Sequence, residues 1–333
     1  MHPRPRAFGE LYERHARALT VARWMDDTDR VRSVAAVAMT SLVLGIGAVG
    51  AAGAGPAEYP FGGMSVAPDG TLYYVDRWYG RIDEVTAGAS SVVLSSLRGG
   101  APADRSIRGL GGLAVAAGSL WFTAGGGLYR ATLDGRDVRR LGMVPGATRL
   151  AVLADRTVLY TTASAVYERA PNGRVARVAG GGTIPFREQV GEHRATALAD
   201  LSPVSVAGVS AQVFYFTNEN NLYRVDRGEA EMLRPLLDFS NGELASGPRG
   251  SVYGICQWAM CRIRGHTFTR LFRLPTRIGG RFTAPDALAV SPAGSFYVSY
   301  SSQSGTTGTA GIAELTATGH VDRIVTSRMT YAG

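Results

Sequence analysis

Short apolar runs recur along the chain in pairs, and a polar turn separates the two members of each pair. In residues 62–76 (GGMSVAPDGTLYYVD), one apolar run leads into a Pro-Asp-Gly turn and a second run ends at Asp76. This pattern predicts two antiparallel strands. Five further stretches repeat it in the same phase, beginning at Gly112, Arg149, Pro203, Glu243 and Ala287. A third and a fourth run follow, so each copy predicts a four-stranded sheet.

The spacing of the copies indicates how the sheets assemble. The reference hydrophobic residue of the first strand recurs at intervals of 49, 37, 54, 40 and 44 residues, at Met64, Leu113, Leu150, Val204, Leu244 and Leu288. Propeller blades are roughly 40 to 50 residues long. A lone four-stranded sheet cannot bury both faces, so neighbouring blades must cover one another and the set must close. The prediction is an all-β fold, a six-bladed β-propeller of four-stranded antiparallel blades, over residues 57–333.

An uncharged segment precedes the repeats. Residues 34–55 run for 22 positions without a charged side chain, close to the length of about 20 that spans a bilayer. Arginines lie just before it, so the positive-inside rule places the N-terminus in the cytoplasm. We expect residues 1–33 to be a cytoplasmic tail, a short helix or disordered, and residues 34–55 to be a single transmembrane helix or signal anchor in the cell membrane, with the propeller outside. The small residues before Gly55 leave open a cleaved signal peptide and a secreted propeller.

The charge of the chain does not indicate a nucleic-acid partner. The formal net charge is +8, and all 35 basic residues are arginine. Nucleic-acid-binding domains concentrate basic residues in one patch or stripe. Here the arginines are spread over all of the predicted blades, so we expect a dispersed, solvated surface, and no nucleic acid among the partners.

The two cysteines lie close together in the fifth copy. Cys256 and Cys261 flank a predicted tight turn, which brings their side chains near enough to form a disulfide. A disulfide suits an exported protein. Two cysteines without a nearby Cys or His pair supply too few ligands for a tetrahedral zinc site.

The strand order decides which loops share a face of the propeller. If the first strand of each blade lines the axis, its starting end lies on one side of the ring, here named the entry face. The connections between blades and the turns between second and third strands lie there too, whereas the Pro-Asp-Gly turns lie on the opposite side, the exit face. Long loops are expected on the entry face at residues 95–108, 180–200, 275–283 and 301–311. Because propeller insertions tend to build a binding face, the entry face is the predicted site.

Several motifs resemble NHL-repeat propellers. Residues 178–186 read Val-Ala-Gly-Gly-Gly-Thr-Ile-Pro-Phe, and Ala195-Thr-Ala-Leu-Ala-Asp-Leu-Ser-Pro follows. Both segments are similar to the linker of NHL-repeat proteins, and the blade pattern with Pro-Asp-Gly and Leu-Tyr-Tyr-Val-Asp is similar to the repeat itself. The resemblance covers about residues 59–326 and implies a propeller used mostly for binding, including sensor domains outside bacterial membranes.

Related six-bladed propellers that are enzymes provide an alternative. A gluconolactonase-like site would hold calcium or another divalent metal through several oxygen ligands at the channel mouth, where Asp286, Glu243 and Asn241 are expected. Arg149 at the same level opposes a cation and favours an Arg-carboxylate cluster. Gly118-Ser-Leu-Trp-Phe-Thr resembles strands of streptogramin lyases, but no histidine here matches that family's catalytic one. We therefore expect binding without a cofactor or metal; the alternative is a lyase or lactone hydrolase.

Aromatic and amide side chains at the entry-face turns are the remaining candidates for ligand contact. Trp78 and Tyr79 of the first copy and Trp258 of the fifth lie at matching turns, where they could form an interface hot spot or a stacking platform for carbohydrate. The alternative is that they cover the rim between blades. Asn218 and Asn220 in the fourth copy could bind polar ligand groups or form the turn. The expected partner is a protein, a glycan or a small ligand, and the chain is expected to be a monomer.

Overall fold

The computed structural model describes residues 61–331, apart from short gaps at residues 87–88, 98–106, 186–187, 200, 202, 219–220, 235–242, 279–280, 283 and 305–306. The predicted tail and transmembrane segment, residues 1–33 and 34–55, lie outside the described residues, so they stay predictions. Within the described part of the chain, no helix is long and apolar enough to cross a membrane.

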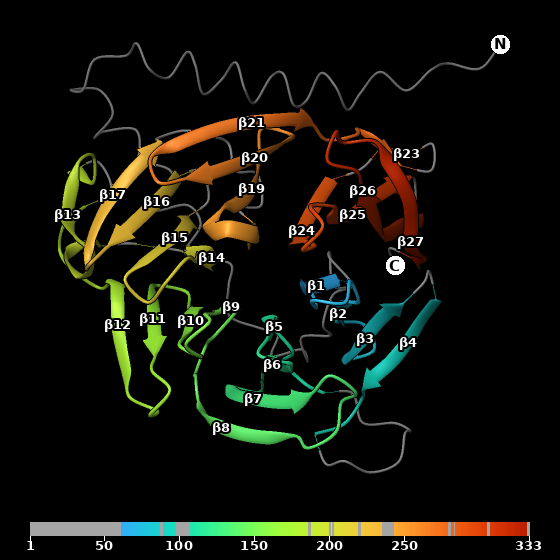
Figure 1. Cartoon of the computed structure of the whole chain (residues 1–333), viewed down its shortest axis with the longest axis horizontal. Coiled ribbons are helices and arrows are strands. Elements are labelled where there is room, and N and C mark those ends of the chain that lie inside the picture. Colours follow the sequence, from blue (N-terminus) through green and yellow to red (C-terminus); the bar gives the residue numbers. More distant parts are fainter. Residues whose placement is uncertain are drawn as a thin grey trace, which may run out of the picture. The chain divides into compact units, whose positions relative to one another are not determined.

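Six antiparallel sheets of consecutive strands form the ring, as predicted (Figure 1). Blade 1 contains β1 (Phe61–Val66), β2 (Leu72–Asp76), β3 (Arg81–Thr86) and β4 (Ala89–Leu94). Blade 2 contains β5 (Leu113–Ala116), β6 (Ser119–Ala124), β7 (Gly127–Thr132) and β8 (Arg139–Met143). Blade 3 contains β9 (Arg149–Val152), β10 (Val158–Thr161), β11 (Ala165–Arg169) and β12 (Val175–Gly180).

The second half of the ring has the same plan with additions. Blade 4 contains β14 (Pro203–Gly208), β15 (Val213–Asn218), β16 (Asn221–Asp226) and β17 (Glu229–Arg234). Blade 5 contains β18 (Leu244–Ser246), β19 (Val252–Cys256), β20 (Ala259–Arg264) and β21 (Thr267–Arg273). Blade 6 contains β24 (Ala284–Val290), β25 (Phe296–Ser304), β26 (Thr307–Leu315) and β27 (Val321–Tyr331). The additions are β13 (Glu192–Arg194), the 3-10 turns η3 (Ala195–Ala197) and η4 (Pro248–Gly250), and the hairpin of β22 (Arg277–Ile278) and β23 (Arg281–Phe282).

Apolar side chains of neighbouring blades fill the space between the sheets. Ile82 of blade 1 and Phe122 of blade 2 are fully buried in one shared cluster, and Tyr74 of blade 1 and Ile312 of blade 6 are fully buried in another. Burying one such side chain contributes roughly 1.5–3 kcal/mol. Blade 6 therefore packs on blade 1 in the same way as the other neighbouring blades pack on each other. Each of these two blades is built from consecutive strands, so neither contributes a strand to the other.

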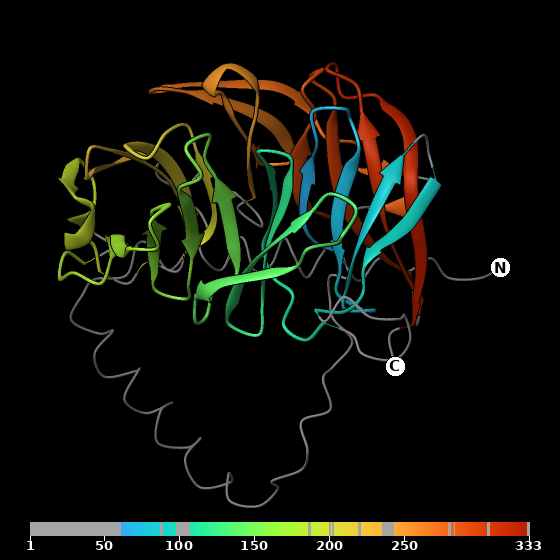
Figure 2. The ribbon, with the colours of Figure 1, turned by 60° about the horizontal axis from the view of Figure 1, so that its bottom comes forward.

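Backbone hydrogen bonds define the entry face. The connection that leaves each of three blades bonds to the turn between that blade's second and third strands: Ile107 to Gly80 at 2.6 Å, Val144 to Gly126 at 2.8 Å, and Leu274 to Trp258 at 2.8 Å. In Figure 2 the strands run between the two sides of the ring, with turns at both ends. The second-to-third-strand turns and the inter-blade connections therefore share one face, together with the starting ends of the first strands.

The first strand of blade 4 differs from the prediction. A bulge shifts the register of β14 between Pro203 and Ser205, and beyond it Val206 is opposite Phe216. This is the pairing that the reference hydrophobic residue makes with its second strand in blades 1 and 2. The reference residue of blade 4 is thus Val206, and the assignment to Val204 was wrong. The two valines flank one serine, so a strand period of two could not separate them.

Three of the four predicted long loops contain regular structure, which in residues 275–283 is the hairpin of β22 and β23. Within residues 180–200, β13 pairs with β17 and adds a fifth strand to the outer edge of blade 4. Within residues 301–311, β25 and β26 continue as a hairpin to the pair Ser304 and Thr307. The Ser, Thr and Gly content that suggested a loop there is compatible with paired strands, because the ladder satisfies the backbone groups.

Candidate functional site

An ion pair joins two non-adjacent blades at the channel mouth. Arg149 begins β9 in blade 3, and Glu243 immediately precedes β18 in blade 5. Arg149 Nε donates to Glu243 Oε1 at 2.5 Å. Ser205 of the intervening blade donates to Glu243 Oε2 at 3.4 Å and accepts the Leu244 amide proton at 3.0 Å. Three successive blades are thereby connected through one carboxylate.

The surroundings of this carboxylate oppose cation binding. The Glu243 side chain is 6% exposed and that of Arg149 is 15% exposed, so water screens the pair weakly. Both carboxylate oxygens have hydrogen-bond donors, and the guanidinium places a positive charge where a divalent ion would need negative ligands. Among the described side chains, no group of three or more His, Cys, Asp or Glu could hold a metal ion.

Below the mouth, a small cavity follows the axis of the ring. Its volume is about 170 Å³, and the inner strands of all six blades line it. Ligand pockets for small molecules usually have about 300–1,000 Å³, whereas this cavity has room for a few water molecules. A ligand larger than this would have to bind outside the axial cavity.

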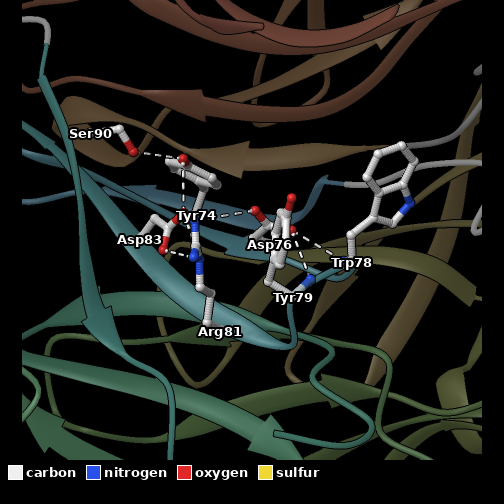
Figure 3. A network of polar contacts seen from close by, with 7 residues as sticks. All are labelled: Tyr74, Asp76, Trp78, Tyr79, Arg81, Asp83 and Ser90. Atoms are coloured by element: carbon white, nitrogen blue, oxygen red, sulfur yellow. Dashed lines mark hydrogen bonds and ion pairs between the residues drawn. The ribbon is translucent and has the colours of Figure 1, made fainter. Parts of the chain in front are cut away.

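The turn after β2 presents aromatic side chains on a fixed backbone (Figure 3). Asp76 is 1% exposed, and its Oδ1 accepts the amide protons of Trp78 at 3.1 Å and Tyr79 at 3.2 Å. Asp side chains commonly cap turns in this way. The Tyr79 ring is 53% exposed, and the guanidinium of Arg81 lies 4.7 Å from its centre. This cation–π contact supports the ring from one side.

A buried carboxylate holds Arg81 in place. Asp83 is fully buried, and its two oxygens lie 2.8 Å and 3.1 Å from Arg81 Nε. The Tyr74 hydroxyl donates to Asp83 at 3.2 Å and also contacts the Ser90 hydroxyl at 2.9 Å (Figure 3). Networks of this kind fix side-chain rotamers when their members are hydrogen-bonded. The Tyr79 platform therefore rests on a pre-ordered base within blade 1.

The equivalent turn of blade 5 presents Trp258. Its side chain is 42% exposed. The structure joins Cys256 and Cys261 by a disulfide beside this turn, with their Cα atoms 6.2 Å apart. Arg270 of β21 donates to the side chain of Gln257, the other residue of this turn, at 2.8 Å.

The amide and carboxylate candidates have different outcomes. Asn218 is 6% exposed, and its Oδ1 accepts from Asn221 Nδ2 at 3.1 Å, so its side chain serves the turn. Asp286 belongs to β24, but its side chain is not among those described. Asn220 and Asn241 lie outside the described residues. The structure thus brings together Arg149 and Glu243 at the mouth.

Three residues of these networks were missed from the sequence. Ser205 was hidden by the bulge in β14, and Pro203 had been assigned its position. The sequence pattern marks Arg81 and Asp83 as residues of the third strand of the first copy and gives them no further role. Their alternation in β3 places both side chains on one face of the sheet, and a charged pair beside Asp76 was a signal that could have identified them.

Comparisons with known proteins establish the fold alone. No family model matches the chain, and no curated protein matches it. A solved structure assigned as a gluconolactonase has a TM-score of 0.50 at 11% identity, over 73% of this chain and 86% of that one. Virginiamycin B lyase from Staphylococcus aureus has a TM-score of 0.49 at 13% identity, over 77% and 83%. Regucalcin from Agrobacterium tumefaciens has a TM-score of 0.48 at 14% identity, over 72% and 81%.

Proposed function

We propose that this chain is a membrane-anchored, extracytoplasmic, NHL-like β-propeller that binds a protein, glycan or small ligand on its entry face. The observation that carries the proposal is the Tyr79 platform. The exposed Tyr79 ring lies at a turn whose backbone is hydrogen-bonded to the buried Asp76. The guanidinium of Arg81 contacts the ring and forms an ion pair with the buried Asp83. A ring presented in this way loses little conformational entropy on binding.

The channel mouth supports binding over chemistry. A lyase or lactone hydrolase with a divalent metal would need free oxygen ligands there, but Glu243 is engaged by Arg149 and Ser205. A thermal-shift titration of the purified chain with calcium, magnesium and zinc distinguishes the two functions. The binding proposal predicts no saturable shift in melting temperature, and a saturable shift abolished by Asp286→Ala would favour the metal enzyme.

Photo-crosslinking tests the binding face directly. The photoreactive residue p-benzoylphenylalanine replaces Tyr79 in the full chain, expressed in the cells that produce it. The matched control carries the same residue at Val209, which is 41% exposed in the turn between β14 and β15 on the exit face. We expect an adduct from position 79 that is missing at position 209. Equal adducts at both positions, or none at position 79, would contradict the proposal.

The location of the propeller has its own test. Residues 34–55 and the arginines before them support an outside position for the ring. Protease added to intact cells should therefore cleave the propeller and leave the N-terminal tail protected. A propeller that is cleaved only after permeabilisation would contradict this topology, and release into the medium would identify a cleaved signal peptide.

A further inference from the structure

The turn that presents Trp258 has an unusual backbone conformation. Gln257 and Trp258 form the two-residue loop between β19 and β20, with Cys256 opposite Ala259. Their φ angles are 47° and 59°. Such two-residue hairpin loops need positive φ at both positions and therefore favour Asn-Gly, Asp-Gly or Gly-Gly. Within the described residues, this is the one place where two consecutive non-glycine residues have positive φ.

Blade 2 contains the same turn in its relaxed form. Gly125 and Gly126 join β6 to β7, and their φ angles are 52° and 74°. The connection leaving the blade bonds to the second turn residue in both cases, at 2.8 Å to Gly126 and 2.8 Å to Trp258. The propeller thus accepts Gly-Gly at this position, and folding does not require Gln-Trp. A bulky residue at positive φ is an outlier, and strained backbone of this kind concentrates at functional sites.

The strained turn holds an aromatic ring beside hydrogen-bonding groups. Trp258 is 42% exposed, and Gln257 accepts from Arg270 at 2.8 Å. The core of a stable protein interface is mostly apolar, whereas the other residue of this turn, Gln257, carries an amide that accepts a hydrogen bond from Arg270 of β21. A saccharide presents a C–H-rich face that stacks on indole and a hydroxyl edge that pairs with such polar groups. These features favour a glycan over a protein surface.

We infer that the Gln257 and Trp258 turn is a glycan-binding element, in which Trp258 stacks on a sugar ring and Gln257 with Arg270 binds its hydroxyls. The inference rests on the proposed function, because it names the ligand class for the same face. The backbone strain and the binding role are separable: glycine at position 258 relieves the strain and removes the ring, whereas alanine removes the ring and keeps the strain.

The first arm of the test measures stability of the purified full chain. Trp258→Gly should melt about 2–4 °C above Trp258→Ala, even though glycine adds entropy to the unfolded chain. The matched control is Gly126→Ala in blade 2. The space around that position is open, with nothing nearer than 3.9 Å, so this variant should melt lower than the wild type by a similar amount. Equal melting temperatures of the two Trp258 variants would show that the turn is unstrained and would overturn the inference.

The second arm measures binding to a printed panel of oligosaccharides built from neutral hexoses and N-acetylhexosamines. The wild type should bind a subset of the panel, and Trp258→Ala and Trp258→Gly should each weaken that binding at least about tenfold, as expected for an interface anchor. Val209→Ala on the exit face should bind as the wild type does. No binding by the wild type, or full binding by Trp258→Ala, would overturn the glycan assignment. In that case, a protein adduct at position 79 would still support ligand binding on the entry face, and only the glycan assignment would be wrong.

Discussion

Removing the arginine of the channel-mouth pair tests whether Glu243 is a structural carboxylate or an available ligand. In Arg149→Met, a side chain of similar length replaces the guanidinium and leaves Glu243 buried. Its remaining described donor is Ser205, at 3.4 Å. The Glu243 side chain is 6% exposed, so water cannot replace the lost partner without local opening.

The expected loss of stability is large for one substitution. Removing one partner of a buried ion pair costs roughly 3–5 kcal/mol, because the other charge stays desolvated. At roughly 2–4 °C per kcal/mol, the melting temperature should fall by about 10 °C. The double variant Arg149→Met, Glu243→Leu removes both charges. It should therefore regain most of the stability that Arg149→Met loses.

A double-mutant cycle measures the coupling between the two side chains. Urea unfolding of the wild type, the two single variants and the double variant gives four free energies of unfolding. We expect a coupling energy of at least about 2 kcal/mol. Additive losses below about 1 kcal/mol each would mean that solvent screens the pair. Glu243 would then be available to bind a cation, and a metal site at the mouth would be favoured.

Three further predictions concern stability. Ser205→Ala leaves a buried amide of the next blade without its acceptor and should lower the free energy of unfolding by about 1–3 kcal/mol in urea titrations; an unchanged midpoint would contradict the bulge register. Replacing both Cys256 and Cys261 by alanine should cost about 2 kcal/mol, the value for so short a closed loop, and a reductant should lower the wild-type melting temperature but not that of the variant. Burial raises the pKa of Tyr73 and of Tyr223 to about 12 from the ordinary value of 10.0. Because the pKa of each is higher in the folded than in the unfolded chain, their contribution to stability is complete below pH 10 and is lost as the pH rises towards 12. In an absorbance titration, part of the tyrosinate should form only near pH 12, and this part should be smaller in Tyr223→Phe than in the wild type.

The architecture was predictable because its signals are local and repeated. Each exit-face turn closes on a few residues of suitable type, as where Asp69 accepts the Thr71 amide proton at 2.9 Å and Gly70 has a φ of 91°. The strand period of two then fixes which side chains are buried. Six repetitions of this unit leave ring closure as the way to cover every blade.

The site was less predictable because it depends on long-range geometry. Arg149 and Glu243 are 94 positions apart, and their contact requires the register of the blade between them, which a bulge displaces. The pairing of β13 with β17 also joins segments that no local pattern connects. The strain at Trp258 could not be predicted from the sequence, because a tryptophan at a turn is compatible with a role in covering the rim between blades until its φ angle is known.

The two faces of the ring differ in the residues that form the turns between consecutive strands of a blade. On the exit face, one hydrogen-bond pattern closes the turn between the first and second strands in five of the six blades, as from Ala67 to Thr71 at 2.8 Å and from Ser291 to Ser295 at 2.9 Å. Blade 2 has a two-residue turn there. On the entry face, equivalent turns use unlike residues: a four-residue turn capped by Asp76, a glycine pair in blade 2, and the strained pair ending in Trp258. A turn that recurs in most blades is explained by folding alone. Two of these entry-face turns present exposed aromatic rings, Tyr79 and Trp258, and the second turn has two consecutive non-glycine residues at positive φ. Under the proposed function, ligand contact accounts for this conformation, which the backbone by itself disfavours.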